Sequence, residues 1–179
     1  MKKLLLLFTA VTILGCSSDN DSQNNSTASG EISLSGDKYP LESGFIEKRE
    51  YLYTIYLTKG SLSKNADGKL KYSSDFQHAV RIYINYDYDH LPDDLIGGLY
   101  INNGAEVRLN GIEFMSNYEI VNGDADYFNK LLTNDDLDYS NGNVIIKKIG
   151  DEYDFSFVLI THIGLVTGHY RGKLTKLNY

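Results

Sequence analysis

The chain has few of the residues that stabilise small extracellular folds: one cysteine, two prolines and no tryptophan in 179 residues. A single cysteine, Cys16, excludes a disulfide within the chain. Positive charge is also scarce, with 17 Lys and Arg against 24 Asp and Glu and a net charge of −7. Because nucleic-acid binding depends on neutralising phosphates with basic side chains, this acidic composition excludes that function.

Long apolar runs are missing after residue 16, but the first sixteen residues are different. Lys2 and Lys3 precede an almost wholly apolar stretch from Leu4 to Leu14, and Gly15 and Cys16 follow. As a helix this stretch would be about 16 Å long, roughly half of a ~30 Å hydrocarbon core. It is too short for a permanent span, and it predicts a signal peptide over residues 1–15, cleaved between Gly15 and Cys16.

The sequence Ile13-Leu14-Gly15-Cys16 resembles the lipobox of bacterial lipoproteins, although Leu14 is bulkier than the residue usual at its position. The resemblance implies that Cys16 becomes the new N-terminus and is the lipid attachment residue, so that its acyl chains bind the membrane. Two or more chains anchor a protein stably, at about 0.8 kcal/mol per buried methylene. The alternative is an ordinary signal peptide whose cysteine is incidental.

Residues 17–30 are polar, and Ala28 is their only apolar side chain. Such a segment buries too little apolar surface to fold, so residues 16–30 are predicted to be an acylated cysteine and a flexible tether, with a reach on the order of 20 Å. Residues 17–21 (SSDND) resemble the acidic export signal of Bacteroidota surface lipoproteins. That resemblance implies an outer-membrane location with surface exposure; a generic polar tether is the alternative.

The remaining residues, 31–179, are expected to form one β-rich domain, because 15 tyrosines and frequent glycines favour strands and turns. Apolar residues alternate over 79–88, and again over 143–149, 152–161 and 165–177, with turns between the last three. The fold class predicted is all-β, an antiparallel β-sandwich or a partly open barrel with a C-terminal three-stranded meander. Gly168 in the last strand predicts a crossing side chain or a bend.

Other segments are less regular. Residues 60–75 are polar and are predicted to be a loop around a turn at 65–68. Residues 125–132 have apolar side chains at roughly helical spacing after a capping Asp124, so at most one short helix is expected there. The sequences Asn102-Asn103-Gly104 and Asn110-Gly111 are typical of hairpin turns.

Two motifs carry a resemblance that covers most of the chain after the leader. They are Gly36-x-x-Tyr39-Pro40-Leu41-x-Ser43-Gly44-Phe45-Ile46 and Thr167-Gly168-His169-Tyr170-Arg171-Gly172-Lys173-Leu174. Both are similar to segments of small surface lipoproteins of Bacteroidota. The resemblance implies an all-β, sandwich-like lipoprotein domain and implies no particular chemistry.

Catalytic and metal-binding motifs are missing from the sequence. It has no GxSxG elbow, Gly-rich phosphate loop, HExxH or CxxC. The histidines His78, His90, His162 and His169 lack close metal-ligand spacing. We therefore expect no enzymatic activity and no cofactor.

Two groups of residues remain as candidate sites. Asp87, Asp89, Asp93 and Asp94 crowd one strand-to-loop junction and are calcium candidates, since calcium prefers several oxygen ligands; a solvated acidic loop is the alternative. Tyrosines on the faces opposite the main apolar ones are candidates for a glycan- or peptide-binding platform, unless they pack a second core. These candidates are Tyr56 and Tyr83.

Taken together, these features predict a lipid-anchored, non-enzymatic protein of the cell envelope that binds an unknown protein or glycan ligand. The alternative is a structural or accessory docking subunit of an outer-membrane assembly. A concave pocket with convergent Tyr and Asp residues would favour binding, whereas a flat surface with an exposed apolar patch would favour docking.

Overall fold

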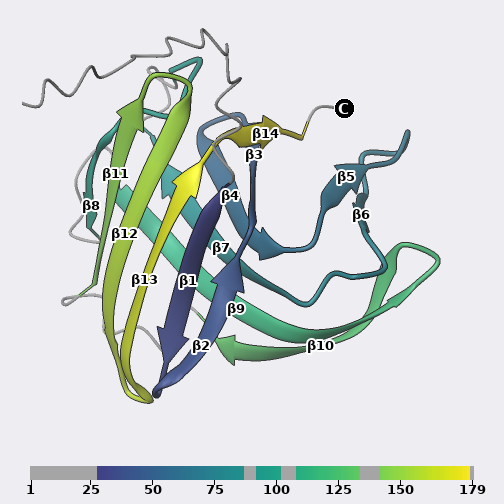
Figure 1. The fold of residues 1–179 in the computed structure, drawn as a ribbon. Helices are drawn as coiled ribbons and strands as arrows, with labels where there is room; N and C mark the ends of the chain where they lie inside the picture. Colours follow the sequence, from purple (N-terminus) through teal and green to yellow (C-terminus); the bar gives the residue numbers. More distant parts are fainter. Residues whose placement is uncertain (1–27, 87–91, 102–107, 134–141, 178–179) are drawn as a thin grey trace, which may run out of the picture.

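The computed structural model describes residues 28–86, 92–101, 108–133 and 142–177. Within these residues the chain forms strands and no helix, arranged as two six-stranded sheets and a two-stranded ribbon (Figure 1). The predicted all-β, antiparallel, sandwich-like fold is therefore confirmed. The sheets are open at their edges and do not close into a barrel.

Sheet A contains the predicted C-terminal meander, and all of its neighbouring strands are antiparallel. In spatial order its strands are β2 (Asp37–Leu41), β1 (Ser29–Leu34), β13 (Gly164–Gly172), β12 (Glu152–Thr161), β11 (Asn143–Ile149) and β8 (Gly98–Ile101). Pro40 lies in the edge strand β2, where its missing N–H breaks no ladder.

Sheet B packs against sheet A and is antiparallel except at one edge, where its last strand pairs in parallel with β3. Its strands in order are β10 (Asp124–Leu132), β9 (Arg108–Val121), β7 (His78–Asn85), β4 (Leu52–Lys59), β3 (Ser43–Arg49) and β14 (Leu174–Lys176). The predicted last strand, 165–177, is therefore two strands, because the chain leaves sheet A after Gly172 and enters sheet B.

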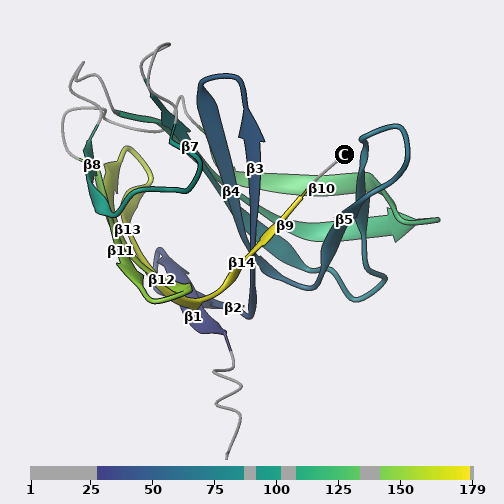
Figure 2. The same cartoon turned by 90° about the horizontal axis from the view of Figure 1, so that it is seen from above.

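The two sheets face each other (Figure 2), and the main hydrophobic core is formed by side chains from both. It is filled by alternating side chains, as the period of two along a strand requires. On β12 the inward residues Phe155, Phe157 and Leu159 are at most 1% exposed, while the residues between them face solvent. On β7 the apolar side chains predicted to share one face are likewise buried, while Arg81, Tyr83 and Asn85 between them are partly exposed.

A second hydrophobic cluster covers the opposite face of sheet B. There the ribbon of β5 (Leu62–Lys64) and β6 (Leu70–Tyr72) lies beside sheet B (Figure 2). Leu62 of the ribbon is buried in one cluster with Phe45, Tyr56 and Met115. Strand β4 is consequently buried on both faces. The prediction of a loop over 60–75 is wrong for these six residues, although the turn at 65–68 is confirmed.

The predicted helix at 125–132 is wrong, because these residues belong to strand β10, which pairs with β9. Asn122 and Gly123 both have positive φ and form the two-residue turn of this hairpin, a geometry that Asn-Gly favours. Three register shifts interrupt the pairing. These irregularities break the strict alternation, so the apolar residues fall at a spacing that imitates a helix.

The expected turn at Asn110-Gly111 is also wrong, since β9 continues through it. Tyr83 pairs with Gly111 and Ile84 with Leu109, which leaves Asn110 as the extra residue of a β-bulge. The other expected hairpin turn, 102–104, lies outside the described residues.

Candidate functional site

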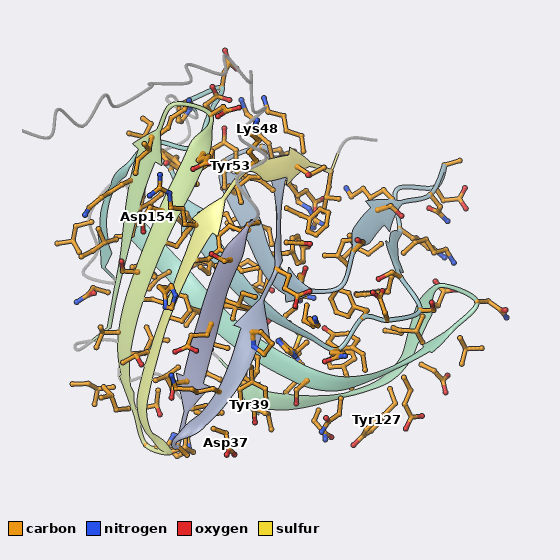
Figure 3. The ribbon with its side chains drawn as sticks, in the orientation of Figure 1. Asp37, Tyr39, Lys48, Tyr53, Tyr127 and Asp154 are labelled. Atoms are coloured by element: carbon orange, nitrogen blue, oxygen red, sulfur yellow. The ribbon has the colours of Figure 1, made fainter. Side chains whose placement is uncertain are left out.

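A cleft opens between the two sheets at one end of the sandwich. Its volume is about 580 Å³, within the range of ~300–1,000 Å³ typical of small-molecule sites. Figure 3 marks this end by Lys48 and Tyr53, where β3 and β4 meet. We call it the interlayer cleft, and it is lined by Ile46, Lys48, Tyr53, Asp93, Asp94, Leu95, Lys148, Gly150, Asp151, Tyr153, Leu174 and Lys176.

The crossing of the chain from sheet A to sheet B builds one wall of the cleft. It brings Leu174 and Lys176 of β14 beside β3. The side chains of Tyr170 and Leu174 lie very close to the backbone of β3 at Gly44. A Cβ atom on Gly44 would lie 2.6 Å from the Tyr170 hydroxyl oxygen and 2.7 Å from a methyl carbon of Leu174. A glycine at position 44 therefore allows β14 to join the sheet and complete this wall.

The base of the cleft is apolar and holds the segment that follows Pro92. Tyr53 is only 2% exposed, and its hydroxyl donates a hydrogen bond of 2.5 Å to the carbonyl oxygen of Pro92. Leu95 is 1% exposed. Burial, with smaller contributions from neighbouring groups including Asp94, raises the pKa of Tyr53 to about 12, so its hydroxyl stays a donor at neutral pH.

The rim of the cleft is made of ion pairs. The Asp94 carboxylate faces two ammonium groups, with Oδ2 3.2 Å from Lys148 Nζ and Oδ1 3.3 Å from Lys176 Nζ. Asp93 Oδ1 lies 3.3 Å from Lys48 Nζ. Hydrogen bonds from Lys148 and Lys176 lower the pKa of Asp94, and its carboxylate in turn raises the pKa of Lys148. Both partners are therefore charged at neutral pH.

Of the four calcium candidates, Asp93 and Asp94 lie in the cleft, and Asp87 and Asp89 lie outside the described residues. The carboxylates of Asp93 and Asp94 face lysines and do not converge on a common point. Across the described part of the chain, no group of three or more His, Cys, Asp or Glu side chains could hold a metal ion.

The two candidate platform tyrosines lie on sheet B, Tyr56 in β4 and Tyr83 in β7. Tyr56 is 4% exposed and belongs to the second hydrophobic cluster, as the second-core alternative expects, so it offers no platform. The Arg81 guanidinium carbon lies 5.4 Å from the centre of its ring. Tyr83 is half-buried, and its hydroxyl donates to Glu113 (2.8 Å) and accepts from Arg81 (3.1 Å).

The histidines are dispersed. His78 is 4% exposed and its Nε2 is 2.5 Å from the carbonyl oxygen of Pro40; burial lowers its pKa, so the ring is neutral at neutral pH. His162 and His169 are exposed on sheet A, and His90 lies outside the described residues.

The residues that sequence reasoning missed are the three rim lysines. Lys48, Lys148 and Lys176 come from β3, β11 and β14, so they share no motif or spacing. Only the folding of both sheets brings them to the same end of the molecule. No sequence signal marks them beyond their positions near strand ends.

Gly15 and Cys16, the predicted cleavage and lipid attachment residues, are outside the described residues. A search of the described residues finds no helix with the length and apolarity needed to cross a bilayer.

Comparison with known proteins gives no assignment: no family model, no curated protein and no solved structure matches this chain.

Proposed function

We propose that the chain is a lipid-anchored, non-enzymatic protein of the outer membrane that binds a ligand in the interlayer cleft. The single observation that supports binding is this concave site, which is lined by Tyr53, Tyr153, the two loop aspartates and lysines from both sheets. A cavity of this size, with an apolar base and a charged rim, has room for a small ligand and polar groups that could orient it.

The anchor is supported by the sequence of the leader. Ile13-Leu14-Gly15-Cys16 fits a lipobox, and the polar residues 17–27 separate it from the first described residue. The acyl chains on Cys16 would hold the protein at the membrane, and the acidic residues after it favour the outer membrane and surface exposure.

Replacing Cys16 with alanine should abolish incorporation of radiolabelled palmitate, because no other side chain in the sequence has a thiol. Labelling in an expressing bacterial host measures this, and Ser17→Ala, a neighbouring change that keeps the thiol, should label normally. Continued labelling of Cys16→Ala would overturn the anchor.

Binding in the cleft can be tested by screening glycans and peptides against the purified chain in detergent, followed by nuclear magnetic resonance mapping of any hit. A cleft ligand should shift the amide resonances of Tyr53, Leu95 and Tyr153, which form its base. Hits that leave these amides unchanged and shift others would contradict the proposal.

A second candidate function, docking in an envelope assembly, is favoured by the outer face of sheet A. Leu99, Ile145, Val158, Ile160 and Leu165 are 38–61% exposed on β8, β11, β12 and β13; Leu99 pairs with Ile145, and Ile160 pairs with Leu165. In the same mapping experiment a docking partner would shift these residues and leave the cleft unchanged. The two functions therefore give separate results.

A further inference from the structure

Two lysines, one from each sheet, hold a single aspartate at the rim of the cleft. Each of the two oxygens of the Asp94 carboxylate faces a different ammonium group, that of Lys148 on sheet A and that of Lys176 on sheet B. A carboxylate from this chain thus sits where an external carboxylate would be held by two cations at once.

The cations and the anion come from different kinds of structure. Lys48, Lys148 and Lys176 lie on strands β3, β11 and β14, whose ladders fix their backbones. Asp93 and Asp94 lie on an irregular segment before β8. The lysines are therefore the permanent part of the site, and the aspartates are the part that can be exchanged.

A ligand could replace the Asp94 carboxylate at a small cost in free energy. Asp94 is 53% exposed, and Lys148 and Lys176 are 41% and 63% exposed. Ion pairs as exposed as these are weak, because water competes for both partners. Rotation of the Asp94 side chain into solvent would release both ammonium groups to a ligand without moving a strand.

The surroundings favour a ligand with a body attached to the anionic group. Lys148 Nζ lies 5.8 Å from the centre of the Tyr153 ring, and Ile46 and Leu174 line the cleft beside it. A small inorganic ion would leave most of the 580 Å³ and these apolar walls unused.

We propose that the interlayer cleft binds a small molecule bearing a carboxylate, and that the Asp94 side chain occupies the carboxylate position in the unliganded protein. The inference rests on the proposed ligand-binding function and deepens it by naming the chemical class of the ligand. The carboxylate of the ligand would face Lys148 and Lys176, and its body would lie against Tyr153.

The test is a resonance titration of the chain in detergent with methyl glucuronide, with methyl glucoside as the neutral matched probe and with inorganic phosphate. The glucuronide should shift the amides of Lys148, Tyr153 and Lys176 more strongly than either of the other probes. Equal shifts with glucoside, or with phosphate alone, would overturn the assignment of a carboxylate ligand.

Variants then distinguish competition between the Asp94 carboxylate and the ligand from a general effect of the net charge of the cleft. Asp94→Asn should tighten glucuronide binding about fivefold, because it removes the competing carboxylate. Asp151→Asn makes the same change in charge at the same cleft, but Asp151 pairs with Lys173, so its effect should stay below about twofold. Lys148→Met should weaken binding about tenfold or more.

Equal effects of Asp94→Asn and Asp151→Asn would overturn the competition, and so would an Asp94→Asn protein that loses stability with unchanged affinity. Failure of this inference is distinguishable from failure of the proposed function. Neutral glycans or peptides could shift the amide resonances at the base of the cleft while glucuronide does not. The cleft would then bind ligands, and only the assignment of a carboxylate ligand would be wrong.

Discussion

Replacing Lys64 with methionine should lower the free energy of unfolding by about 3 kcal/mol, because it removes a cation from a buried ion pair. The side chains of Lys64 and Glu47 are 2% and 1% exposed, and Lys64 Nζ lies 2.8 Å from Glu47 Oε1. The pair joins β5 of the ribbon to β3 of sheet B. Arg49 Nε also contacts this carboxylate, at 2.6 Å, but the Arg49 side chain is largely exposed.

The matched control is Lys38→Met, which breaks an ion pair of similar length between Lys38 and Glu31. Both of those side chains are exposed, so water replaces the lost partner and the cost should stay below about 1 kcal/mol. Urea denaturation of both variants at pH 7 measures the difference. Equal losses would show that the buried pair contributes no more than a surface pair.

The effect of Lys64→Met should also shrink in acid. Burial raises the pKa of Glu47, but hydrogen bonds from Arg49 and Lys64 outweigh it, and the pKa falls below the ordinary value of 4.5. Stability from the Glu47 carboxylate is therefore present above about pH 4.5 and is lost as the pH falls through the lower value of the folded state. A difference between wild type and Lys64→Met that stays constant from pH 7 to pH 3 would contradict this linkage.

The double variant Glu47→Leu/Lys64→Met removes both buried charges together. In Lys64→Met the Glu47 carboxylate stays buried without its lysine, whereas the double variant removes this carboxylate as well. The double variant should therefore recover much of the free energy of unfolding lost in Lys64→Met. It also tests whether the ribbon is held by apolar contacts of the second cluster, which the double variant retains. If β5 and β6 detach from sheet B in the double variant, the ion pair and not the apolar contacts holds the ribbon in place.

The fold was predictable where side chains alternate without interruption. Strands β7 and β12 have one apolar face and one polar face, so the period of two identifies them directly. Strand β10 was misread because register shifts with β9 break that period. The Asn122-Gly123 pair was the available signal for the hairpin, since both residues adopt positive φ in the turn.

The ribbon and the cleft could not be predicted for a different reason. Strands β5 and β6 have three residues each, too few for an alternation to be detected. The cleft depends on the switch of the chain from β13 to β14, which brings Lys176 near Lys148 through their shared partner Asp94. A continuous strand over 165–177, as expected from sequence, would have left Lys176 on sheet A.

Replacing Gly168 with alanine should destabilise the protein by about 2 kcal/mol, although alanine normally suits a strand better than glycine. Gly168 of β13 pairs with Phe157 of β12, and the phenyl ring lies across it, as the predicted crossing side chain requires. A Cβ atom at position 168 would be 2.1 Å from the ring carbon Cζ. Because Phe157 is 1% exposed, its ring cannot move away without disturbing the core.

Gly98→Ala is the matched control. Gly98 lies exposed in the edge strand β8, and a Cβ atom there would come no closer than 3.8 Å to Tyr100, an ordinary contact. This variant should be neutral or slightly stabilising, since it changes only the conformational freedom of the chain. Urea denaturation gives both values, and a similar loss in the two variants would attribute the effect to the backbone rather than to the ring.

A double-mutant cycle identifies the ring as the cause. In a Phe157→Leu background the side chain opposite position 168 is shorter, so the added methyl group of Gly168→Ala should cost about 1 kcal/mol less than it does in the wild type. The coupling arises because both changes act on one volume between β12 and β13. Additive costs would instead mean that the backbone of β13 requires glycine at position 168 whichever side chain stands at position 157.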